Sequence, residues 1–499
     1  MFAQEAHRLE SCTRRCHVRG VHRRKGRVMR KWWPLVAVCL GSFMLIVDTT
    51  VVTVALPVMA GDLGATVAHV QWVLNVYTLA LAVMTLGAGS LGDLFGQRRV
   101  FVSSLAVFAV ASLACGVAPD AGVLIAARGV QGAGGAAMIG TTLALLGSSY
   151  RDRDRGTAIG VWSGVLGIAA AAGPLLGGVL TQYLGWRAIF FVNLPVSVVA
   201  LVPAALSVGD PPRREGARID VPGMLAFAAF TGTLTFALIR VGGGGGWTSG
   251  PSAVLFAVSV LALVAFVLVE VRRKHPVLDL ALFRNASFAV IVLCVVATSV
   301  TFACLVYTSF WLQSALGLGS LPAGVALVPM ALTSFLASVL IGKRLHAVPP
   351  RVTIGGGLLL IGAGCALIGF TVDGGSSWYA LAPALVLVGA GIGVSGPGTN
   401  AAVLASAPPD RGGMASGAMA TFRQLGQALG VAVLGLFYLA AAQHPAPGED
   451  VRDAAARGLD DVYLIAAGFG LLACLLAFGP AGRGIMATTA RRDPTGARR

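Results

Sequence analysis

The sequence predicts an all-α polytopic membrane protein with about fourteen transmembrane helices, and three observations support this class. Of the 499 residues, 56% are hydrophobic and only 12% are charged, whereas about a quarter of a soluble domain is charged. The mean hydropathy is +0.81, and apolar stretches of about 20 residues recur along the chain. Basic residues gather in alternate loops between these stretches. The high hydrophobicity excludes a disordered chain, and the sparse cysteines exclude a secreted disulfide scaffold.

The apolar stretches are long enough to cross a bilayer as helices. They lack the alternation of polar and apolar residues that a membrane β-barrel needs. With boundaries accurate to a few residues, the predicted spans are residues 34–56, 71–91, 100–117, 122–146, 157–180, 188–206, 221–240, 251–271, 286–308, 322–341, 352–371, 378–403, 413–442 and 461–479.

The distribution of positive charge predicts the orientation of the chain. Most of the 37 lysines and arginines lie in the two tails and in the loops near residues 98–99, 151–155, 213–218, 272–284, 343–351 and 411. These segments share one side of the membrane, so we expect a multi-pass protein of the plasma (inner) membrane with both termini in the cytoplasm. The segment 444–461 is acidic and is expected to be an outer loop. This topology accounts for the net charge of +16 without nucleic acid.

The first 28 residues are rich in arginine and run straight into the first span, which argues against a signal peptide. Cys12, Cys16, His17 and His22 match no standard zinc spacing, so no metal site is expected. A polybasic tail on anionic lipid is one interpretation. We favour a start of translation at Met29.

The loop after the second span reads GSLGDLFGQRR, from Gly89 to Arg99. Glycine at two positions permits a tight turn and close helix approach, and two arginines sit at the membrane surface. The pattern resembles the signature loop of the major facilitator superfamily. That resemblance implies a gate on the cytoplasmic side, with the residues Gly89, Asp93, Gly96, Arg98 and Arg99.

Further stretches agree with this family. ARGVQGAGGA resembles its fourth-span motif, with a buried Arg128, and GPLLGG resembles the motif of its antiporters. The antiporter residues are Gly160, Gly173, Pro174, Gly177 and Gly178, whereas the middle glycine of the pattern is Ala169 here. LIVDTTVVTVALP, with Thr53 for the usual Asn, together with WRAIFFVNLP, HPVLDLALFRN and ASGAMATFRQLGQALG, resembles the fourteen-span drug:proton antiporter branch of multidrug exporters.

The resemblance implies two six-helix bundles around a central cavity, with two spans inserted between them. The expected parts are a basic tail (1–32), the first bundle (33–208), the insert with its linkers (209–285), the second bundle (286–480) and a basic tail (481–499). Gly342, Lys343 and Arg344 stand where a second signature loop would fall, but that segment lacks its Asp.

Ionisable residues inside membrane spans are functional candidates, and three lie well inside: Asp48, Arg128 and Arg423. At 1.5 Å per residue, Asp48 lies about 13 Å from the outer end of its span, taken at Pro57, and Arg128 lies roughly 9 Å from the outer face. The two therefore share a depth. We expect Asp48 to carry protons and Arg128 to tune it. The alternatives are a static polar anchor and a structural bond to backbone carbonyls. Arg423 either lines the cavity or is structural.

Polar and aromatic residues within spans give candidates for the cavity and the substrate: Asn75, Tyr77, Gln131, Trp162, Trp311, Gln313, Asn400, Arg423 and Gln424. Tyr77, with Trp72, also fits an interfacial belt or core packing. No Asp or Glu is expected inside a span of the second half, because Asp460 and Asp461 only border one. Multivalent cations need several buried carboxylates. The substrate is therefore expected to be neutral, anionic, zwitterionic or a monovalent hydrophobic cation.

The resulting hypothesis is a secondary active transporter that exports small amphiphilic molecules, such as drugs or antibiotics, in exchange for protons. A dedicated exporter of one endogenous metabolite or natural product is the alternative within transport, and a transport-dead membrane receptor is the alternative outside it. No P-loop and no catalytic cluster occurs, so neither an enzyme nor a cofactor is expected. The expected partners are the substrate, protons and the lipid bilayer, without nucleic acid, and a monomer is compatible with this hypothesis.

Overall fold

The computed structural model describes residues 31–207, 220–273, 276–344, 348–406, 412–443 and 450–479. Within these ranges the regular structure is helical and no strand occurs. Thirteen helices are long and apolar enough to cross a membrane, and a bent helix over residues 157–184 makes fourteen when it counts as one span. The predicted class and span count are confirmed. The predictions for Met29, for Cys12, Cys16, His17 and His22, and for residues 481–499 fall outside the described residues.

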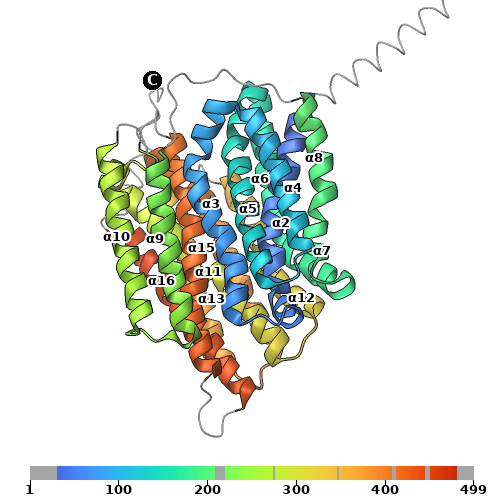
Figure 1. Ribbon diagram of the computed structural model, residues 1–499, viewed down its shortest axis with the longest axis vertical. Helices are drawn as coiled ribbons and strands as arrows, with labels where there is room; N and C mark the ends of the chain where they lie inside the picture. The colour runs from blue at the N-terminus through green and yellow to red at the C-terminus, as the bar shows by residue number, and fades with distance from the viewer. Residues whose placement is uncertain are drawn as a thin grey trace, which may run out of the picture.

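The first bundle occupies the blue-to-teal half of the molecule (Figure 1). Glycines in α5 let α3 approach it closely: a Cβ on Gly132 would lie 2.5 Å from the carbonyl oxygen of Tyr77. This small-residue packing is what the GAGGA run of α5 provides. The helices are α2 (Trp33–Asp62), α3 (Val67–Phe95), α4 (Gln97–Gly116), α5 (Ala121–Ser149), α6 (Asp152–Leu184), the short α7 (Ala188–Phe191) and α8 (Asn193–Ser207).

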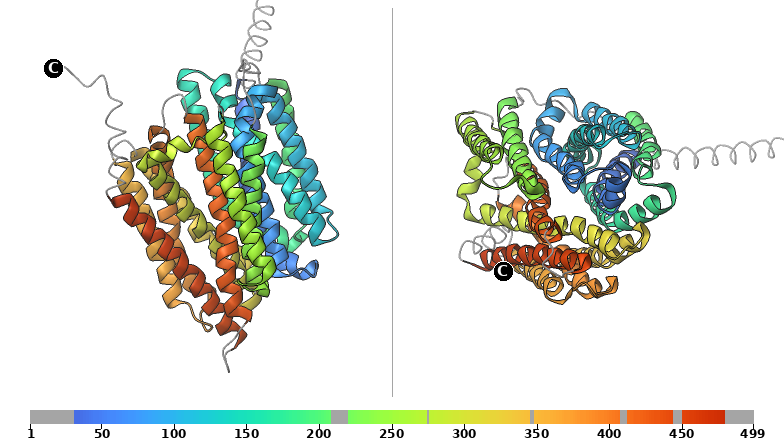
Figure 2. Two further views of the ribbon diagram at one scale, coloured as in Figure 1. Left: turned by 60° about the vertical axis from the view of Figure 1, so that its left-hand side comes forward. Right: turned by 60° about the horizontal axis from the view of Figure 1, so that its bottom comes forward.

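The second bundle lies beside the first, in yellow to red (Figure 2). Glycines again let two helices approach closely. A Cβ on Gly357 would lie 2.6 Å from the carbonyl oxygen of Gly391, and one on Gly391 would lie 2.4 Å from the carbonyl oxygen of Gly357. The elements are α11 (Ala286–Phe310), η3 (Trp311–Ala315), α12 (Ser320–Arg344), α13 (Pro350–Thr371), η4 (Trp378–Leu381), α14 (Ala382–Ser406), α15 (Gly412–Gln443) and α16 (Val451–Phe478).

The insert lies between the two bundles in the sequence and consists of two helices. They are α9 (Val221–Arg240) and α10 (Gly250–Arg272), joined through η1 (Val241–Gly245). α9 contacts α3 of the first bundle and α15 of the second, whereas α10 packs on α9 at the edge of the molecule (Figure 1). The short η2 (Leu280–Arg284) then leads into α11. The glycine run 242–246 lies at the turn between α9 and α10.

We call the end at which α2 begins and α16 ends, uppermost in Figure 1, the terminal end, and the other the far end. Two helices continue beyond their predicted limits at the far end. α2 runs through Pro57 to Asp62, so Pro57 does not end the span. A proline inside a helix removes one hydrogen bond, and here the helix continues past that gap.

The prediction that Asp460 and Asp461 only border a span is wrong. α16 begins at Val451, capped by the Asp450 side chain, which accepts a hydrogen bond from the Val451 N–H at 2.7 Å. Both aspartates therefore lie in the third turn of a helix that counts as a membrane span. The run DAAARGLDD is polar but made of residues that a helix accepts, so the helix extends past the apolar stretch.

Candidate functional site

Asp48 occupies the middle of α2 and is only 2% exposed. It lies fifteen residues after the first residue of α2 and fourteen before the last, which is about 21 Å from either end of the helix. Apolar residues precede it along the chain, and Thr49 and Thr50 separate it from the next apolar run. A carboxylate in such a place is stable only when charged or hydrogen-bonding partners replace the water it has lost.

Arg128 of α5 provides the charged partner. Its Nη1 donates to Oδ2 of Asp48 at 2.5 Å, and neither side chain has more than 1% of its surface exposed. The expectation that the two residues share a depth is confirmed. The guanidinium also donates from Nε to the carbonyl oxygen of Val73 at 3.2 Å and lies 3.9 Å from the ring centroid of Tyr77. Arg128 thus binds both the acid and the backbone of α3.

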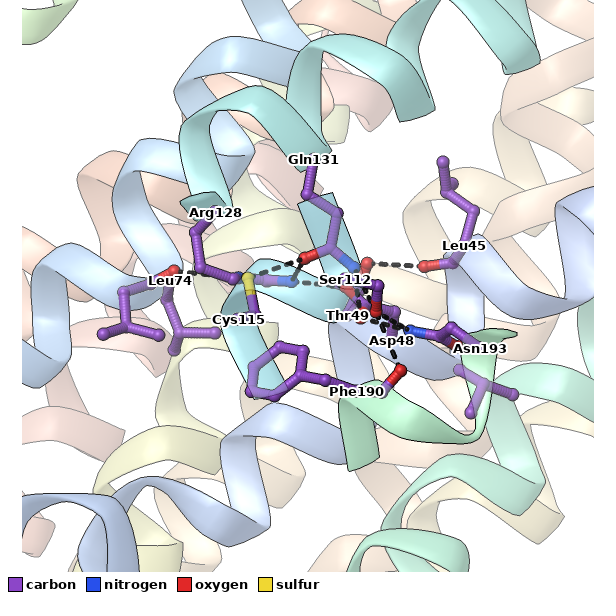
Figure 3. Close-up of polar contacts among 12 residues, drawn as sticks. Leu45, Asp48, Thr49, Leu74, Ser112, Cys115, Arg128, Gln131, Phe190 and Asn193 are labelled. Carbon is purple, nitrogen blue, oxygen red and sulfur yellow. Dashed lines mark hydrogen bonds and ion pairs between the residues drawn. The ribbon is translucent and has the colours of Figure 1, made fainter. Parts of the chain in front are cut away.

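Two side-chain amides complete the surroundings of the carboxylate (Figure 3). Oδ1 of Asp48 accepts hydrogen bonds from Nε2 of Gln131 and Nδ2 of Asn193, both at 3.0 Å. The same two amide groups donate to Oγ of Ser112, at 3.3 Å and 3.0 Å. Ser112 in turn donates to the carbonyl oxygen of Phe190 at 2.9 Å. We call Asp48, Arg128, Gln131, Asn193 and Ser112 the acid network.

The acid network connects four helices of the first bundle, because its members come from α2, α4, α5 and α8. Arg128, Gln131 and Asn193 each donate to a carboxylate oxygen of Asp48. A further donor, Nη2 of Arg128, is buried without a hydrogen-bond partner. The arrangement can therefore exchange the partners of Arg128 if Asp48 gains a proton.

Asn193 and Ser112 are site residues that the sequence did not indicate. Asn193 was visible as a lone amide inside the apolar stretch 188–206, and such a residue is costly in a membrane unless it has partners. Ser112 gave no signal, because serine is common in membrane helices and bonds readily to its own backbone. Gln131, by contrast, was selected as a substrate candidate, and the structure places it in the acid network, where Nη1 of Arg128 donates to its Oε1 at 2.8 Å.

The signature loop turns sharply at Gly96, whose φ of 96° favours glycine over any L side chain. Its N–H donates to the carbonyl oxygen of Gly92 at 3.0 Å, which ends α3. Arg98 then donates from Nη2 to the carbonyl oxygen of Ala205, close to the end of α8, while Arg99 is exposed at the surface. The side chain of Asp93 and the surroundings of Gly89 lie outside the described residues.

The antiporter motif lies on α6, which bends by 44° between Ala170 and Ala172. The bend lies just before Pro174, which cannot donate to the carbonyl oxygen of Ala170. Beyond the bend, glycines permit close approach on two sides of α6. A Cβ on Gly177 would lie 2.8 Å from the carbonyl oxygen of Val51 in α2, and one on Gly178 would lie 2.8 Å from that of Ser320 in α12.

The remaining glycines of the antiporter motif, Gly173 and Gly160, differ in how closely other helices approach them. A Cβ on Gly173 would lie 1.8 Å from Oγ1 of Thr50, so α2 and α6 touch there as well, whereas one on Gly160 would meet nothing within 4 Å. From the opposite side, a Cβ on Gly324 of α12 would lie 2.5 Å from the carbonyl oxygen of Pro174. The far-end half of α6 is thus packed between α2 and α12.

Polar contacts join the two bundles from mid-membrane to the far end. Nε2 of Gln71 donates to the Tyr307 hydroxyl at 3.0 Å, and Nε2 of Gln313 donates to the carbonyl oxygen of Val54 at 2.8 Å. Near the middle of the membrane, Oγ1 of Thr421 donates to the carbonyl oxygen of Ala82 at 3.0 Å. Gln71 and Tyr307 had not been selected from the sequence, because nothing in it indicated that they meet across 236 positions.

Arg423 and Asn400 lie on α15 and α14 and are both exposed. Nη2 of Arg423 donates to Oδ1 of Asn400 at 3.4 Å, and no ion pair of Arg423 occurs among the residues that the structure describes. The neighbouring Gln424 is half-buried. Arg423 lies eleven residues into α15, roughly 16 Å along the helix, and is therefore a cation at the protein surface well inside a membrane span.

The other cavity candidates are less accessible in this conformation. Asn75, Tyr77 and Trp311 are fully buried, and both side-chain polar atoms of Asn75 and Nε1 of Trp311 lack hydrogen-bond partners. Trp162 is half-buried and donates to Oγ of Ser42 at 2.9 Å. Trp72 packs on Phe236 of α9, with 5.8 Å between ring centroids.

No group of three or more metal-ligating side chains occurs in the described part of the chain.

The comparisons with known proteins agree with the fold. Residues 38–431 match the family model described as Major Facilitator Superfamily. Multidrug resistance protein Stp of Mycobacterium tuberculosis (strain CDC 1551 / Oshkosh) is 35% identical over 410 residues, which are 80% of this chain and 74% of Stp.

The tetracenomycin C resistance and export protein of Streptomyces glaucescens is 34% identical over 410 residues, which are 82% of this chain and 76% of that protein. The crystal structure of the human organic anion transporter MFSD10 (TETRAN) has a TM-score of 0.61 at 16% identity and covers 90% of this chain and 99% of its own, a likeness of fold alone. The chain is therefore a multi-pass membrane protein that belongs to the major facilitator superfamily of transporters, and it is similar to multidrug and antibiotic resistance exporters.

Proposed function

We propose that this transporter is a proton-coupled antiporter that exports small amphiphilic molecules from the cytoplasm, with Asp48 as its proton carrier. The acid network is the observation that supports this proposal. Asp48 is the one acid in it, it is buried at mid-membrane, and three donors hold it. Among the residues that the structure describes, it forms with Arg128 the one ion pair in which both side chains are buried.

The coupling step follows from the charges. While Asp48 is ionised, it holds Arg128, and with it α2 and α5, in the observed arrangement. A proton on Oδ2 would turn the acceptor for Nη1 of Arg128 into a hydroxyl and cancel the charge that balances the guanidinium. Arg128 would then depend on Gln131 and on the carbonyl oxygen of Val73 alone. Protonation thus favours a rearrangement of the first bundle.

The far end is the outer side in this proposal, and the terminal end, with both termini, faces the cytoplasm. The hydrogen bonds of Gln71 and Gln313 and the contact between Gly178 and Ser320 close the bundles against each other at the far end. We therefore assign this conformation as closed to the outside. The signature loop, with Gly96 as its hinge and Arg98 on α8, is proposed to gate the cytoplasmic side.

Arg423 and Asn400 are the proposed substrate contacts. An accessible guanidinium without an acidic partner attracts an anionic group, and Asn400 adds both a donor and an acceptor. The substrate is accordingly proposed to be anionic, zwitterionic or neutral, or at most a monovalent hydrophobic cation.

Two substrate ranges are candidates, a broad range of compounds and a single natural product. The name of Stp describes multidrug resistance, which favours a broad range, whereas the name of the tetracenomycin C exporter describes export of a single antibiotic. The latter supports the second candidate, a dedicated exporter of one natural product. In both cases the driving force is the proton gradient, and each charge moved down 100 mV provides about 2.3 kcal/mol.

The proposal is tested with purified protein in liposomes that enclose a pH-sensitive dye. A panel of neutral, anionic and cationic amphiphiles is added without an imposed gradient. Proton movement that starts on addition of a compound, and compound accumulation driven by an imposed pH gradient, are the expected results. Accumulation without proton movement would instead indicate a uniporter, and silence with compounds that bind the protein would support the receptor alternative.

A further inference from the structure

Two further acids are buried in the insert, away from the acid network. Asp220 precedes α9 and Glu270 lies two residues before the end of α10, and each is only 4% exposed. Both lie at the terminal end, where α9 begins and α10 ends. Neither residue belongs to a motif that the proposed function uses.

Each carboxylate uses one oxygen and leaves the other without a partner. Oδ1 of Asp220 accepts a hydrogen bond from the Gly223 N–H at 3.1 Å, as the N-cap of α9. Oε2 of Glu270 accepts from the Leu278 N–H at 3.1 Å. The remaining oxygens, Oδ2 of Asp220 and Oε1 of Glu270, are buried and have no hydrogen-bond partner. A buried acceptor without a donor is unfavourable.

The two unpartnered oxygens lie beside the same point of the backbone. A Cβ on Gly223 would lie 2.6 Å from Oε1 of Glu270 and 2.9 Å from Oδ2 of Asp220. The oxygens therefore face one shared space, which remains open only because residue 223 has no side chain. Two ionised carboxylates in such a space would repel each other in a region that water does not reach.

The surrounding charges do not neutralise the pair. Nε of Arg273 lies 3.7 Å from Oδ1 of Asp220, and the Arg273 side chain is 52% exposed. Asp279, the N-cap of η2, adds a further negative charge on the segment that follows α10. α9 itself has no charged side chain before Arg240, and Lys274 and His275 lie outside the described residues. Among the described residues, one exposed guanidinium, that of Arg273, thus lies beside the two buried acids.

We infer that Asp220 and Glu270 form a proton-binding site that holds one proton between them. Because Arg273 lies on the Asp220 side of the pair, we place the proton on Oε1 of Glu270, which donates a hydrogen bond to Oδ2 of Asp220. That single hydrogen bond satisfies both unpartnered oxygens and removes one buried charge. The pair then fastens the beginning of α9 to the end of α10, and through Leu278 to the segment that leads into the second bundle.

Infrared spectroscopy of the purified protein in lipid nanodiscs tests the site directly, and it does not require transport. All variants carry Asp48→Asn, so that the acid network contributes no carboxyl band. At neutral pH we expect a protonated-carboxyl band that Glu270→Gln removes. Asp120→Asn, which changes the exposed N-cap of α5 outside the insert, is the matched control and should leave the band unchanged. A band that persists in Glu270→Gln would overturn the proposal.

The dependence of thermal stability on pH provides a second test that does not rely on assignment of a band. Proton loss would leave two carboxylates facing each other, so the melting temperature should fall as pH rises through the titration of the pair. Glu270→Gln mimics the protonated form and should lessen that fall, whereas Asp120→Asn, at the exposed N-cap of α5, should not. Equal falls in all three proteins would contradict the inference. Added Mg²⁺ or Ca²⁺ that abolished the fall would also contradict it, in favour of a cation site.

Discussion

Asp48 and Arg128 lie 80 positions apart in the chain and form a buried ion pair of 2.5 Å in the middle of the first bundle. Gln131 and Asn193 donate to the second oxygen of the same carboxylate. The pair is therefore not isolated, and its energy depends on whether Asp48 is charged. This dependence is what allows protonation of Asp48 to change the packing of α2, α4, α5 and α8.

Loss of Arg128 alone should harm the protein more than loss of the whole ion pair. Arg128→Gln leaves a buried carboxylate without its charge partner, and we expect a loss of about 3–5 kcal/mol of stability. The double variant Asp48→Asn with Arg128→Gln removes both charges and should regain a large part of it. Melting temperatures of the wild type, of Arg128→Gln, of Asp48→Asn and of the double variant in one detergent measure the coupling. Additive effects would show that the ion pair is energetically unimportant.

Asn193→Leu should destabilise the protein by about 1–3 kcal/mol, because Asp48 and Ser112 each lose a buried hydrogen-bond donor. Ser197→Ala, on the same helix and equally buried, is the control and should cost less. Thermal unfolding measures both. An Asn193→Leu protein as stable as Ser197→Ala would mean that the amide contributes nothing to the acid network.

The fold was predictable because each membrane helix requires its own apolar stretch, and charge in the loops is visible residue by residue. The ends of helices were less predictable, as Pro57 and Asp460 show, because a helix continues into polar surroundings whenever its residues tolerate it. The depth that Asp48 and Arg128 share followed from counting residues in two spans. The contacts of Asn193, Gln71 and Tyr307 could not be predicted from the sequence, since their partners come from distant helices.

Gly324→Leu should prevent closure of the far end, because even a Cβ there would lie 2.5 Å from the carbonyl oxygen of Pro174. We expect loss of transport and a rise in the labelling of a cysteine placed at Ser320, a residue that is now 4% exposed. A membrane-impermeant maleimide in a background without native cysteines measures that labelling. Gly342→Leu, on the same helix with nothing within 4 Å of its Cβ position, is the control. Equal labelling in the two variants would contradict the proposed closure.

Arg423→Gln should selectively weaken the transport of anionic compounds. The substitution removes the accessible charge but keeps a hydrogen-bonding group beside Asn400. Loss of one charge-assisted hydrogen bond costs about 1.5–3 kcal/mol, which is about 10-fold to 100-fold in apparent affinity, with neutral compounds affected little. Competition assays across a matched series of anionic and neutral amphiphiles test this. A uniform loss for both series would assign Arg423 a structural role instead.

The central claim is that Asp48 carries the proton, and proton release from inverted vesicles tests it most directly. Vesicles with wild-type protein or Asp48→Asn are energised, the active compounds are added, and the internal pH is recorded. Asparagine keeps the shape and accepts from Gln131 and Asn193, but it cannot exchange a proton at neutral pH. We predict substrate-evoked proton release by the wild type and none by Asp48→Asn. Release of equal size by Asp48→Asn would contradict the claim and place the proton carrier elsewhere.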